Sequence, residues 1–209
     1  FVMPNLGGGG GERIISILLN NLDRSMYQVN LVIIKKNGSN AFVKDLKDDV
    51  GVHYLNVKNR IRLSFPWVAI KLARFCFRKK VDIMFFGSGQ INAILSPFLF
   101  LFPKKTTLIA RESNIPSQFE NIAFVRFLYR NTYKNYDKVI VQSDDMYNDL
   151  HNNFQLPKSK LVKINNPVDF SFIQSKKEEE VEINFTKDKL NLLAAGRLTY
   201  QKGFDILIK

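Results

Sequence analysis

The chain has 209 residues, of which 45% are hydrophobic, and 31 Lys and Arg against 19 Asp and Glu give it a formal net charge of +12. This length and composition predict a globular protein with one full domain and part of another. The single cysteine, Cys76, excludes an intramolecular disulfide and favours a reducing cytosol. The longest apolar run, residues 91–102, contains Pro97 and is shorter than the roughly 18 residues of a membrane-spanning helix.

Short β-branched or aromatic runs alternate along the chain with longer amphipathic runs, which is typical of parallel βα units. The predicted strands are 1–3, 29–35, 52–57, 82–86, 107–111, 138–142, 161–164 and 190–195. The predicted helices are 12–22, 42–48, 67–80, 91–101, 119–136 and 144–154. The predicted fold class is therefore α/β, a Rossmann-like doubly wound parallel sheet that binds ligands at the carboxyl ends of its strands.

The predicted domain boundaries follow a change in composition after residue 169. Residues 1–169 form the first Rossmann-like domain, 170–189 a charged linker, and 190–209 the truncated start of a second Rossmann-like domain. The linker prediction depends on Pro167 and on the charged run 176–180, which favour a solvated connection over a packed helix. Because the chain starts on Phe1 and ends within the last predicted helix, we expect both ends to be trimmed.

A glycine-rich loop, NLGGGGGER, joins the first predicted strand to the first predicted helix. Glycine lets the backbone approach a ligand closely because it has no Cβ. A dinucleotide-binding G-x-G-x-x-G does not fit, since the last position falls on Glu12, Arg13 or Ile14. The next strand ends in two lysines and offers no acidic residue for a ribose, and no G-K-[ST] follows the glycines. An NAD-dependent dehydrogenase and a P-loop NTPase are therefore disfavoured.

The last segment, AAGRLTYQKGFDILIK, places Arg197 and Lys202 in a turn between an apolar run and a predicted helix. Backbone N–H groups at a helix start attract anions, while Arg offers a planar fork and Lys a point charge to phosphate oxygens. The pattern predicts a receptor for a diphosphate. Surface cations beside a turn are the alternative interpretation of the same residues.

Four motifs in this order, GGGGGER, ARESN, NNPVD and GRLTYQKGFD, resemble the retaining glycosyltransferases of family four over essentially the whole chain. The resemblance implies the GT-B arrangement, in which two Rossmann-like domains face a cleft. It implies transfer of a sugar, with retention, from a nucleotide-diphosphate sugar, UDP-linked, to a glycan or lipid-linked glycan acceptor. The pathway implied is surface polysaccharide or glycoconjugate biosynthesis.

The resemblance also implies roles for residues within these motifs. A basic pair grips the donor diphosphate and offsets charge on the leaving nucleotide, an electrostatic role that requires neither a metal nor a cofactor. The implied catalytic residues are Arg197, Lys202 and Glu112; the donor-binding residues are Gly10, Gly11, Gly196, Arg197 and Lys202; and the acceptor-side residues are Arg111 and Asn114. Glu112 could instead form a local cap or ion pair. The fragment alone is expected to be inactive.

The positive charge is concentrated between Lys58 and Lys80, where eight Lys or Arg occur with no Asp or Glu. Cations next to aromatic residues are typical of segments that bind a membrane interface. The predicted membrane patch is Arg60, Arg62, Trp67, Lys71, Arg74 and Arg78, on a helix whose neighbouring face is expected to carry Ile70, Ala73 and Phe77. A core helix with a solvated cationic side is the alternative.

These observations predict a cytoplasmic enzyme that binds peripherally to the anionic inner face of the cell membrane. The alternative function is a non-catalytic basic α/β module that binds an anionic polymer such as nucleic acid. We expect no nucleic-acid partner, because no recognition motif accompanies the charge. The two histidines, His53 and His151, lack a metal-ligand partner three or four residues away, so structural roles are predicted for both.

Overall fold

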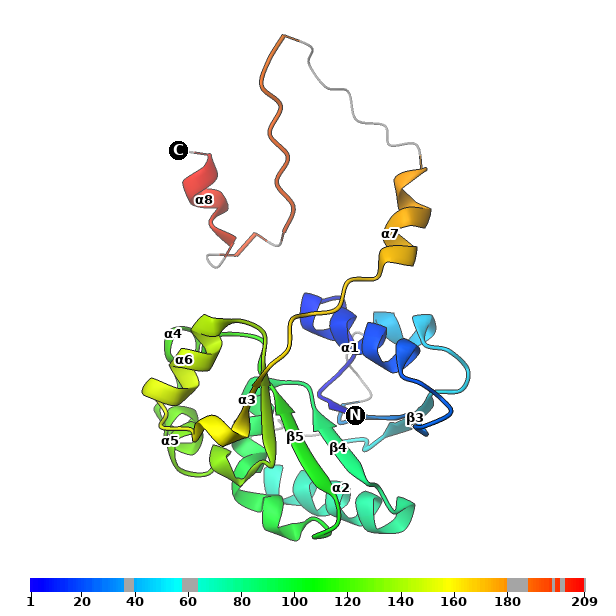
Figure 1. Cartoon of the computed structure of the whole chain (residues 1–209), viewed down its shortest axis with the longest axis vertical. Coiled ribbons are helices and arrows are strands. Elements are labelled where there is room, and N and C mark those ends of the chain that lie inside the picture. The colour runs from blue at the N-terminus through cyan, green and yellow to red at the C-terminus, as the bar shows by residue number, and fades with distance from the viewer. Residues whose placement is uncertain (36–39, 58–63, 180–187, 197, 200–201, 209) are drawn as a thin grey trace. The chain divides into compact units, whose positions relative to one another are not determined.

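The computed structural model describes residues 1–35, 40–57, 64–179, 188–196, 198–199 and 202–208 (Figure 1). The chain divides into two compact units, Phe1–Val168 and Asp169–Lys209. The first unit contains a seven-stranded sheet with helices on both sides, and the described residues of the second include the short helices α7 (Phe170–Lys177) and α8 (Phe204–Leu207).

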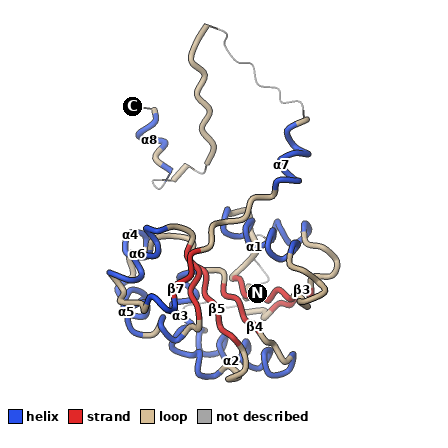
Figure 2. The backbone as a smooth tube through the Cα atoms, viewed as in Figure 1, coloured by secondary structure: helices blue, strands red, loops and turns tan. Residues whose placement is uncertain are grey.

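One parallel sheet of seven strands forms the centre of the first unit (Figure 2). Its strands are β1 (Val2–Met3), β2 (Asn30–Ile33), β3 (Gly51–Tyr54), β4 (Ile83–Phe86), β5 (Thr107–Arg111), β6 (Lys138–Val141) and β7 (Leu161–Lys163). Their spatial order is β3-β2-β1-β4-β5-β6-β7, and every neighbouring pair is parallel. The seven predicted strands of the first domain and the Rossmann-like α/β fold class are confirmed.

The helices cover the two faces of the sheet through two separate apolar clusters. On one face, α1 (Gly10–Asn21) and the 3-10 helix η1 (Ala41–Asp45) cover β1 to β3, with Ile15 and Leu19 fully buried. The larger cluster on the other face contains residues of α2 (Phe65–Lys79), α3 (Gly89–Leu95), α5 (Ala123–Asn131) and α6 (Asp144–Asn152). The unit therefore has three layers, helix, sheet and helix.

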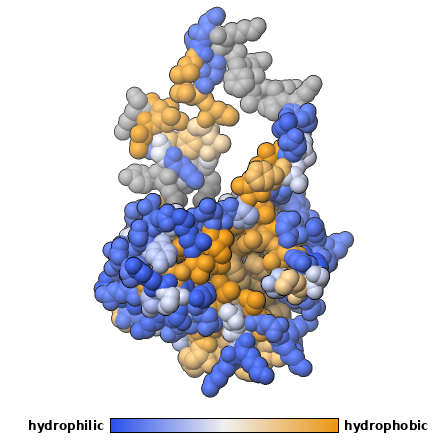
Figure 3. All heavy atoms as spheres, in the orientation of Figure 1, coloured by the Kyte–Doolittle hydropathy of each residue, from blue (hydrophilic) through white to orange (hydrophobic). Residues whose placement is uncertain are grey.

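Part of one sheet face keeps apolar side chains near the surface. Phe85, Ile109, Ile140 and Val162 are each half-buried, and they lie on one face of four neighbouring strands, with Phe85 in register with Ile109 and Ile140 in register with Val162. Figure 3 shows apolar atoms at the surface in the region where Figure 2 draws these strands. Arg111 lies in register with Ile140, so its side chain belongs to this same face.

Three predicted helices are shorter than the periodicity indicated. The predicted helix 91–101 is α3 followed by the 3-10 helix η3 (Ser96–Leu101), since Pro97 has no N–H to continue the α-helical bonds. The predicted helix 119–136 is α4 (Pro116–Phe119), α5 and the 3-10 helix η4 (Tyr133–Asn135). The backbone is extended at residues 120 and 122, where the Glu120 carboxylate accepts a 2.8 Å hydrogen bond from the Ile122 N–H. The predicted helix 42–48 is η1, and a further 3-10 turn, η5 (Lys158–Lys160), precedes β7.

The second unit differs from the sequence prediction at two places. Residues 190–195 form no strand, because no described strand pairs with them, so that prediction is wrong. The helix α7 (Phe170–Lys177) forms inside the predicted linker, where the Asp169 side chain accepts a 3.0 Å hydrogen bond from the Phe172 N–H and caps its start. Helix α8 (Phe204–Leu207) follows later among the described residues of this unit.

The strand order reverses direction between β1 and β4, which creates the switch point of a doubly wound sheet. The loop 4–9 follows β1, and residues 87–88 follow β4, so the two loops leave neighbouring strand ends. A Cβ on Gly87 would lie 2.5 Å from Met3 Sδ and 3.0 Å from the end of Ile15. Glycine at this position therefore allows β4 to leave the sheet directly against β1 and α1.

Candidate functional site

The glycine loop lies at the carboxyl end of β1, where a doubly wound sheet receives its ligand. Helix α1 begins at Gly10, so Gly10 and Gly11 form its first turn, and the first helical backbone bond runs from the Arg13 N–H to the Gly9 carbonyl. The N–H groups ahead of that bond have no helical partner. A Cβ on Gly10 or Gly11 would meet no atom within 4 Å. Packing within the described fold therefore gives no reason for glycine at either position.

The ARESN segment begins with the last two residues of β5, which lies two strands away from β1 in the sheet. Arg111 ends the strand, and Glu112 directly follows it. The buried Asn92 side chain on α3 donates to the carbonyls of Phe86, at 3.2 Å, and Arg111, at 3.1 Å. This amide therefore joins the ends of β4 and β5 and fixes the starts of the two following loops relative to each other.

The Glu112 carboxylate lies inside the first unit, with 2% of the residue exposed. Tyr129 donates a 3.2 Å hydrogen bond to its Oε2, and the Tyr133 hydroxyl donates to its Oε1. Burial raises the pKa of Glu112 from 4.5 to about 7, against the opposing effects of the two tyrosine hydrogen bonds and the Arg111 charge. Gly89 closes over the carboxylate, because a Cβ there would collide with Glu112 Oε2. In this structure the Glu112 carboxylate accepts hydrogen bonds within a buried cluster. Its catalytic role stays a prediction.

Arg111 projects to the opposite face of the sheet and is 3% exposed. Its Nη2 donates a 2.8 Å hydrogen bond to Asn166 Oδ1, and Asn166 in turn donates a 3.1 Å bond to Gln142 Oε1. The Gln142 amide nitrogen donates to the Glu112 carbonyl. Burial lowers the pKa of Arg111, and the nearby Glu112 charge partly offsets that effect. Asn114, the other predicted acceptor-side residue, is exposed in the loop that follows.

In the second unit, the predicted donor-binding residues lie around the turn before α8. A Cβ on Gly196 would lie 3.2 Å from the Phe204 ring and 3.5 Å from Lys202 Cγ, so the backbone at Gly196 approaches both side chains. The Lys202 N–H donates a 2.9 Å hydrogen bond to the Thr199 carbonyl, and Gly203 has a positive φ of 65°. Arg197 lies outside the described residues. Diphosphate binding by this segment stays a prediction.

The predicted membrane patch lies partly on α2. Arg60 and Arg62 lie outside the described residues. Trp67 is 52% exposed, and Arg74 and Arg78 are also exposed. Lys71 is half-buried instead, since its Nζ donates a 2.9 Å hydrogen bond to the Leu55 carbonyl and lies 5.8 Å from the centre of the Trp67 ring.

The face of α2 beside the patch differs from the prediction at one residue. Phe77 is 62% exposed, so its predicted place on the packed face with Ala73 is wrong. The packed face is formed by seven other residues, which are Phe65, Val68, Ala69, Leu72, Ala73, Phe75 and Cys76. The exposed side of α2 therefore carries two aromatic rings among its cations.

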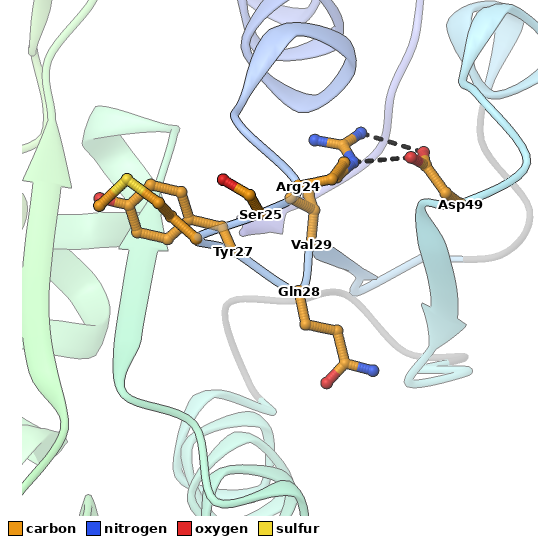
Figure 4. Close-up of a pocket in the computed structure, with 7 residues that line it drawn as sticks. Arg24, Ser25, Tyr27, Gln28, Val29 and Asp49 are labelled. Carbon is orange, nitrogen blue, oxygen red and sulfur yellow. Dashed lines mark hydrogen bonds and ion pairs between the residues drawn. The ribbon is translucent and has the colours of Figure 1, made fainter.

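Two surface hollows lie at the opposite edge of the sheet, near the amino ends of the strands. The smaller, of about 310 Å³, is lined by residues 24–29 and Asp49, and Figure 4 shows its central ion pair. Arg24 donates from Nε and Nη2 to the two Asp49 carboxylate oxygens at 2.8 and 3.1 Å. The larger, of about 530 Å³, is bordered by the end of α1 and the start of β4. Neither is a candidate site, since ligands of doubly wound sheets bind at the carboxyl edge.

The histidines have structural partners in the first unit. His53 Nε2 lies 2.9 Å from Asn30 Oδ1, and its ring contacts Phe75 edge-on. His151 Nδ1 lies 3.0 Å from the Leu156 carbonyl. Over the described ranges, no three His, Cys, Asp or Glu residues gather in a way that could hold a metal ion, and no helix is long and apolar enough to cross a membrane.

Residues 8–172 match the family described as Glycosyltransferase Family 4. The chain belongs to this family. No curated protein matches it. The match covers Gly8–Gly11 of the glycine loop, the ARESN segment and Asn166, so the family assignment rests almost entirely on the first unit.

Two similar solved structures are of one Anabaena protein, Alr3699/HepE, in complex with UDP and glucose and in complex with UDP-glucose. The first has a TM-score of 0.59 and 14% sequence identity, and covers 81% of this chain and 44% of that one. The second has a TM-score of 0.56 and 15% identity, and covers 81% and 43%. The chain thus spans less than half the length of these structures. At such identities the likeness shows the fold alone.

Several residues that the structure brings to the carboxyl edge were missed by the sequence interpretation. Gln142 and Asn166 link Arg111 to β6 and to the segment after β7, while Tyr129 and Tyr133 hold Glu112. Tyr129 and Tyr133 are four residues apart, a spacing that places both on one helical face, which was the available signal. Nothing in the sequence indicates which acidic residue that face would meet.

Proposed function

We propose that this chain is the acceptor-side part of a retaining glycosyltransferase. It moves a sugar from a nucleotide-diphosphate sugar, UDP-linked, to a glycan or lipid-linked glycan acceptor in surface polysaccharide or glycoconjugate biosynthesis. The full enzyme has the two-domain GT-B arrangement, with the second Rossmann-like domain beginning in residues 190–209. The observation that carries the proposal is the match of residues 8–172 to glycosyltransferase family 4.

The geometry of the first unit supports this proposal at the carboxyl edge of the sheet. Gly10 and Gly11 begin α1 at the switch point, and a Cβ at either would meet no protein atom within 4 Å. Unpaired backbone N–H groups at a helix start suit an anionic phosphate. The similar Anabaena structures hold UDP with glucose, or UDP-glucose, which supports the choice of donor.

The second unit supplies the proposed phosphate-gripping cations, Arg197 and Lys202. A guanidinium and an ammonium close to the leaving diphosphate would offset its developing charge without a metal ion, and such a contribution is worth most in the transition state. Removing one donor to a developing anion costs on the order of 3 kcal/mol, or about a hundredfold in rate. The roles of both residues are proposals drawn from the motif GRLTYQKGFD.

The test uses the enzyme at its natural full length with a panel of sugar nucleotides. UDP release would be measured for wild type and for Arg197→Ala and Lys202→Ala, with Lys104→Ala, an exposed lysine of the first unit, as the control. We expect each site variant to lose about a hundredfold in kcat while the control keeps its rate. Unchanged turnover in both site variants would remove the diphosphate assignment.

We further propose that α2 holds the enzyme at the anionic, cytoplasmic face of the membrane. Trp67 and Phe77 expose aromatic rings on this helix beside Arg74, Arg78 and Lys79, which are also exposed. Aromatic residues among cations suit the interface of an anionic bilayer. A peripheral position would bring a lipid-linked acceptor to the enzyme without a spanning helix.

Co-sedimentation tests this position with vesicles of phosphatidylglycerol and phosphatidylcholine. Each Lys or Arg near an anionic leaflet contributes roughly 1 kcal/mol, so changing the four residues Arg74, Arg78, Lys79 and Lys80 to Gln should weaken binding by up to about a thousandfold. A control with the same net charge changes four exposed lysines elsewhere, Lys104, Lys105, Lys134 and Lys158. Equal loss in both variants would mean that total charge, and not α2, governs binding.

A further inference from the structure

The guanidinium of Arg111 is a buried charge that the described part of the chain satisfies only in part. Nη2 donates to Asn166 Oδ1 at 2.8 Å, and the residue is 3% exposed. Nη1 is buried and has no hydrogen-bond partner, the one such side-chain atom among the described residues. Because Arg stays protonated in proteins, an unpaired N–H of this kind is costly. A ligand oxygen at Nη1 would remove that cost.

We propose that Arg111 Nη1 binds an anionic oxygen, of a phosphate or a carboxylate, on the acceptor that receives the sugar. The inference rests on the proposed function and narrows its acceptor to an anionic one. An arginine fork matches the planar geometry of oxyanions and forms shorter, stronger hydrogen bonds with them than with neutral groups. Buried among apolar strands, it would favour a charged acceptor over a neutral glycan.

The surrounding hydrogen bonds hold the guanidinium in place before any ligand arrives. Asn166 accepts from Arg111 and donates to Gln142 Oε1 at 3.1 Å, and Gln142 donates to the Glu112 carbonyl. These groups come from the ends of β5 and β6 and from the segment after β7, all at the carboxyl edge. Because these hydrogen bonds fix Nη2 and the guanidinium is planar, Nη1 also points in a fixed direction. Such preorganisation favours tight binding.

The position of Arg111 separates this oxyanion from the donor diphosphate. The glycine loop follows β1, and β5 lies two places along the sheet, about 10 Å away at the usual strand spacing. Arg111 Nη2 bonds to Asn166, which follows β7, on the side of β5 that is farther from β1. Nη1 has almost no exposed area, so binding requires a neighbouring side chain to change rotamer, and such changes are common at binding surfaces.

Binding to three small probes tests the inference in the full-length enzyme. Glucose 1-phosphate, methyl glucuronide and methyl glucoside carry a phosphate, a carboxylate and no charge, and UDP reports on the donor site. Their dissociation constants would be measured by NMR titration for wild type, Arg111→Gln and a control, Arg130→Gln. Arg130 is an exposed arginine of α5 that donates to the Asn153 carbonyl at 3.2 Å, so its loss removes the same charge from another surface.

We expect wild type and Arg130→Gln to bind one anionic probe alike, and Arg111→Gln to bind it about tenfold to a hundredfold more weakly. The probe that loses affinity identifies the phosphate or the carboxylate. UDP and methyl glucoside should bind all three proteins equally. If neither anionic probe binds wild type, or if Arg111→Gln keeps its affinity, the inference is wrong. A parallel loss of UDP affinity would place Arg111 in the donor site and would also overturn it.

Two further variants keep the test valid if Arg111→Gln does not fold. Arg111→Lys keeps the charge without the fork, and Asn166→Ala keeps the fork without its anchor, so each should lose several-fold affinity for the same anionic probe. Full affinity in both folded variants would contradict the inference. If wild type binds the probe but transfers no sugar from any nucleotide donor, the proposed function fails while the anion site stands.

Discussion

Replacing Gly10 and Gly11 by Ala should raise stability and lower activity at the same time. Both residues belong to the first turn of α1, both have ordinary helical backbone angles, and a Cβ at either would meet no protein atom within 4 Å. A methyl group can therefore enter without strain. Ala also loses less backbone entropy than Gly when a helix forms.

The expected gain in stability follows from helix propensity. Ala is favoured over Gly by up to about 1 kcal/mol inside a helix, and less in its first turn, so the double variant should gain about 1 kcal/mol. For a unit of this size, 1 kcal/mol corresponds to a rise in Tm of about 2–4 °C. If the backbone N–H groups here contact the donor phosphates, the methyl groups occupy the ligand's space. Losing one charged hydrogen bond costs about 1.5–3 kcal/mol, which lowers kcat/KM about tenfold to a hundredfold.

The assay combines thermal unfolding with UDP release from a sugar nucleotide by the full-length enzyme. Asn148→Ala is the matched control, because Asn148 is an exposed residue inside α6 and the same change improves helix propensity away from the loop. The control should gain stability and keep kcat/KM. An unchanged kcat/KM in the Gly10→Ala, Gly11→Ala double variant would refute a close approach of the donor to this loop.

The buried Glu112 cluster yields two further predictions. Because the folded pKa of Glu112, about 7, lies above the unfolded 4.5, its contribution to stability is fully present below pH 4.5 and is lost as pH rises through 7. Glu112→Gln should therefore remove about 3 kcal/mol of the pH dependence of the free energy of unfolding, measured as a smaller fall in Tm between pH 5 and 8. A fall in Tm equal to that of wild type would contradict ionisation of Glu112 in this range. Gly89→Ala should destabilise the protein by about 1–3 kcal/mol in urea unfolding, because the added Cβ would collide with Glu112 and lie 2.9 Å from the Tyr129 hydroxyl. Stability equal to that of wild type would show that the side chains around Glu112 can move to accommodate a methyl group.

The strands of the first unit could be predicted because local pattern and burial agree. β4 and β5 are short apolar runs between polar turns, and both become central strands of the sheet. Parallel strands buried on both faces require such runs. Residues 190–195 carry the same pattern and form no strand in the described chain. A strand depends on a hydrogen-bonded neighbour, which the residue pattern of one segment does not specify.

The helix breaks could not be predicted from periodicity. The interruption between α4 and α5 depends on Glu120, whose carboxylate accepts from the Ile122 N–H and from the Gln90 side chain at 3.1 Å. Gln90 is 30 residues earlier in the chain, so the bond exists only once α3 has packed beside this turn. The short helix α7 had a local signal, an Asp at its start, but the charged residues after it favoured a linker.

The neighbouring residues Arg111 and Glu112 show how the fold separates groups that the sequence places together. Successive residues at a strand end point to opposite faces of a sheet. Glu112 therefore enters the face covered by α3 and α5, where two tyrosines donate to it, while Arg111 enters the other face and bonds to Asn166. A motif comparison treats the pair as one polar group beside the sugar. The structure places the two residues in different environments. Burial favours the neutral form of the Glu112 carboxyl group, whereas Nη1 of the Arg111 guanidinium is buried without a hydrogen-bond partner. Gln142 connects the Glu112 carbonyl to Asn166, the partner of Arg111, so hydrogen bonds couple Arg111 and Glu112 in addition to the attraction between their charges.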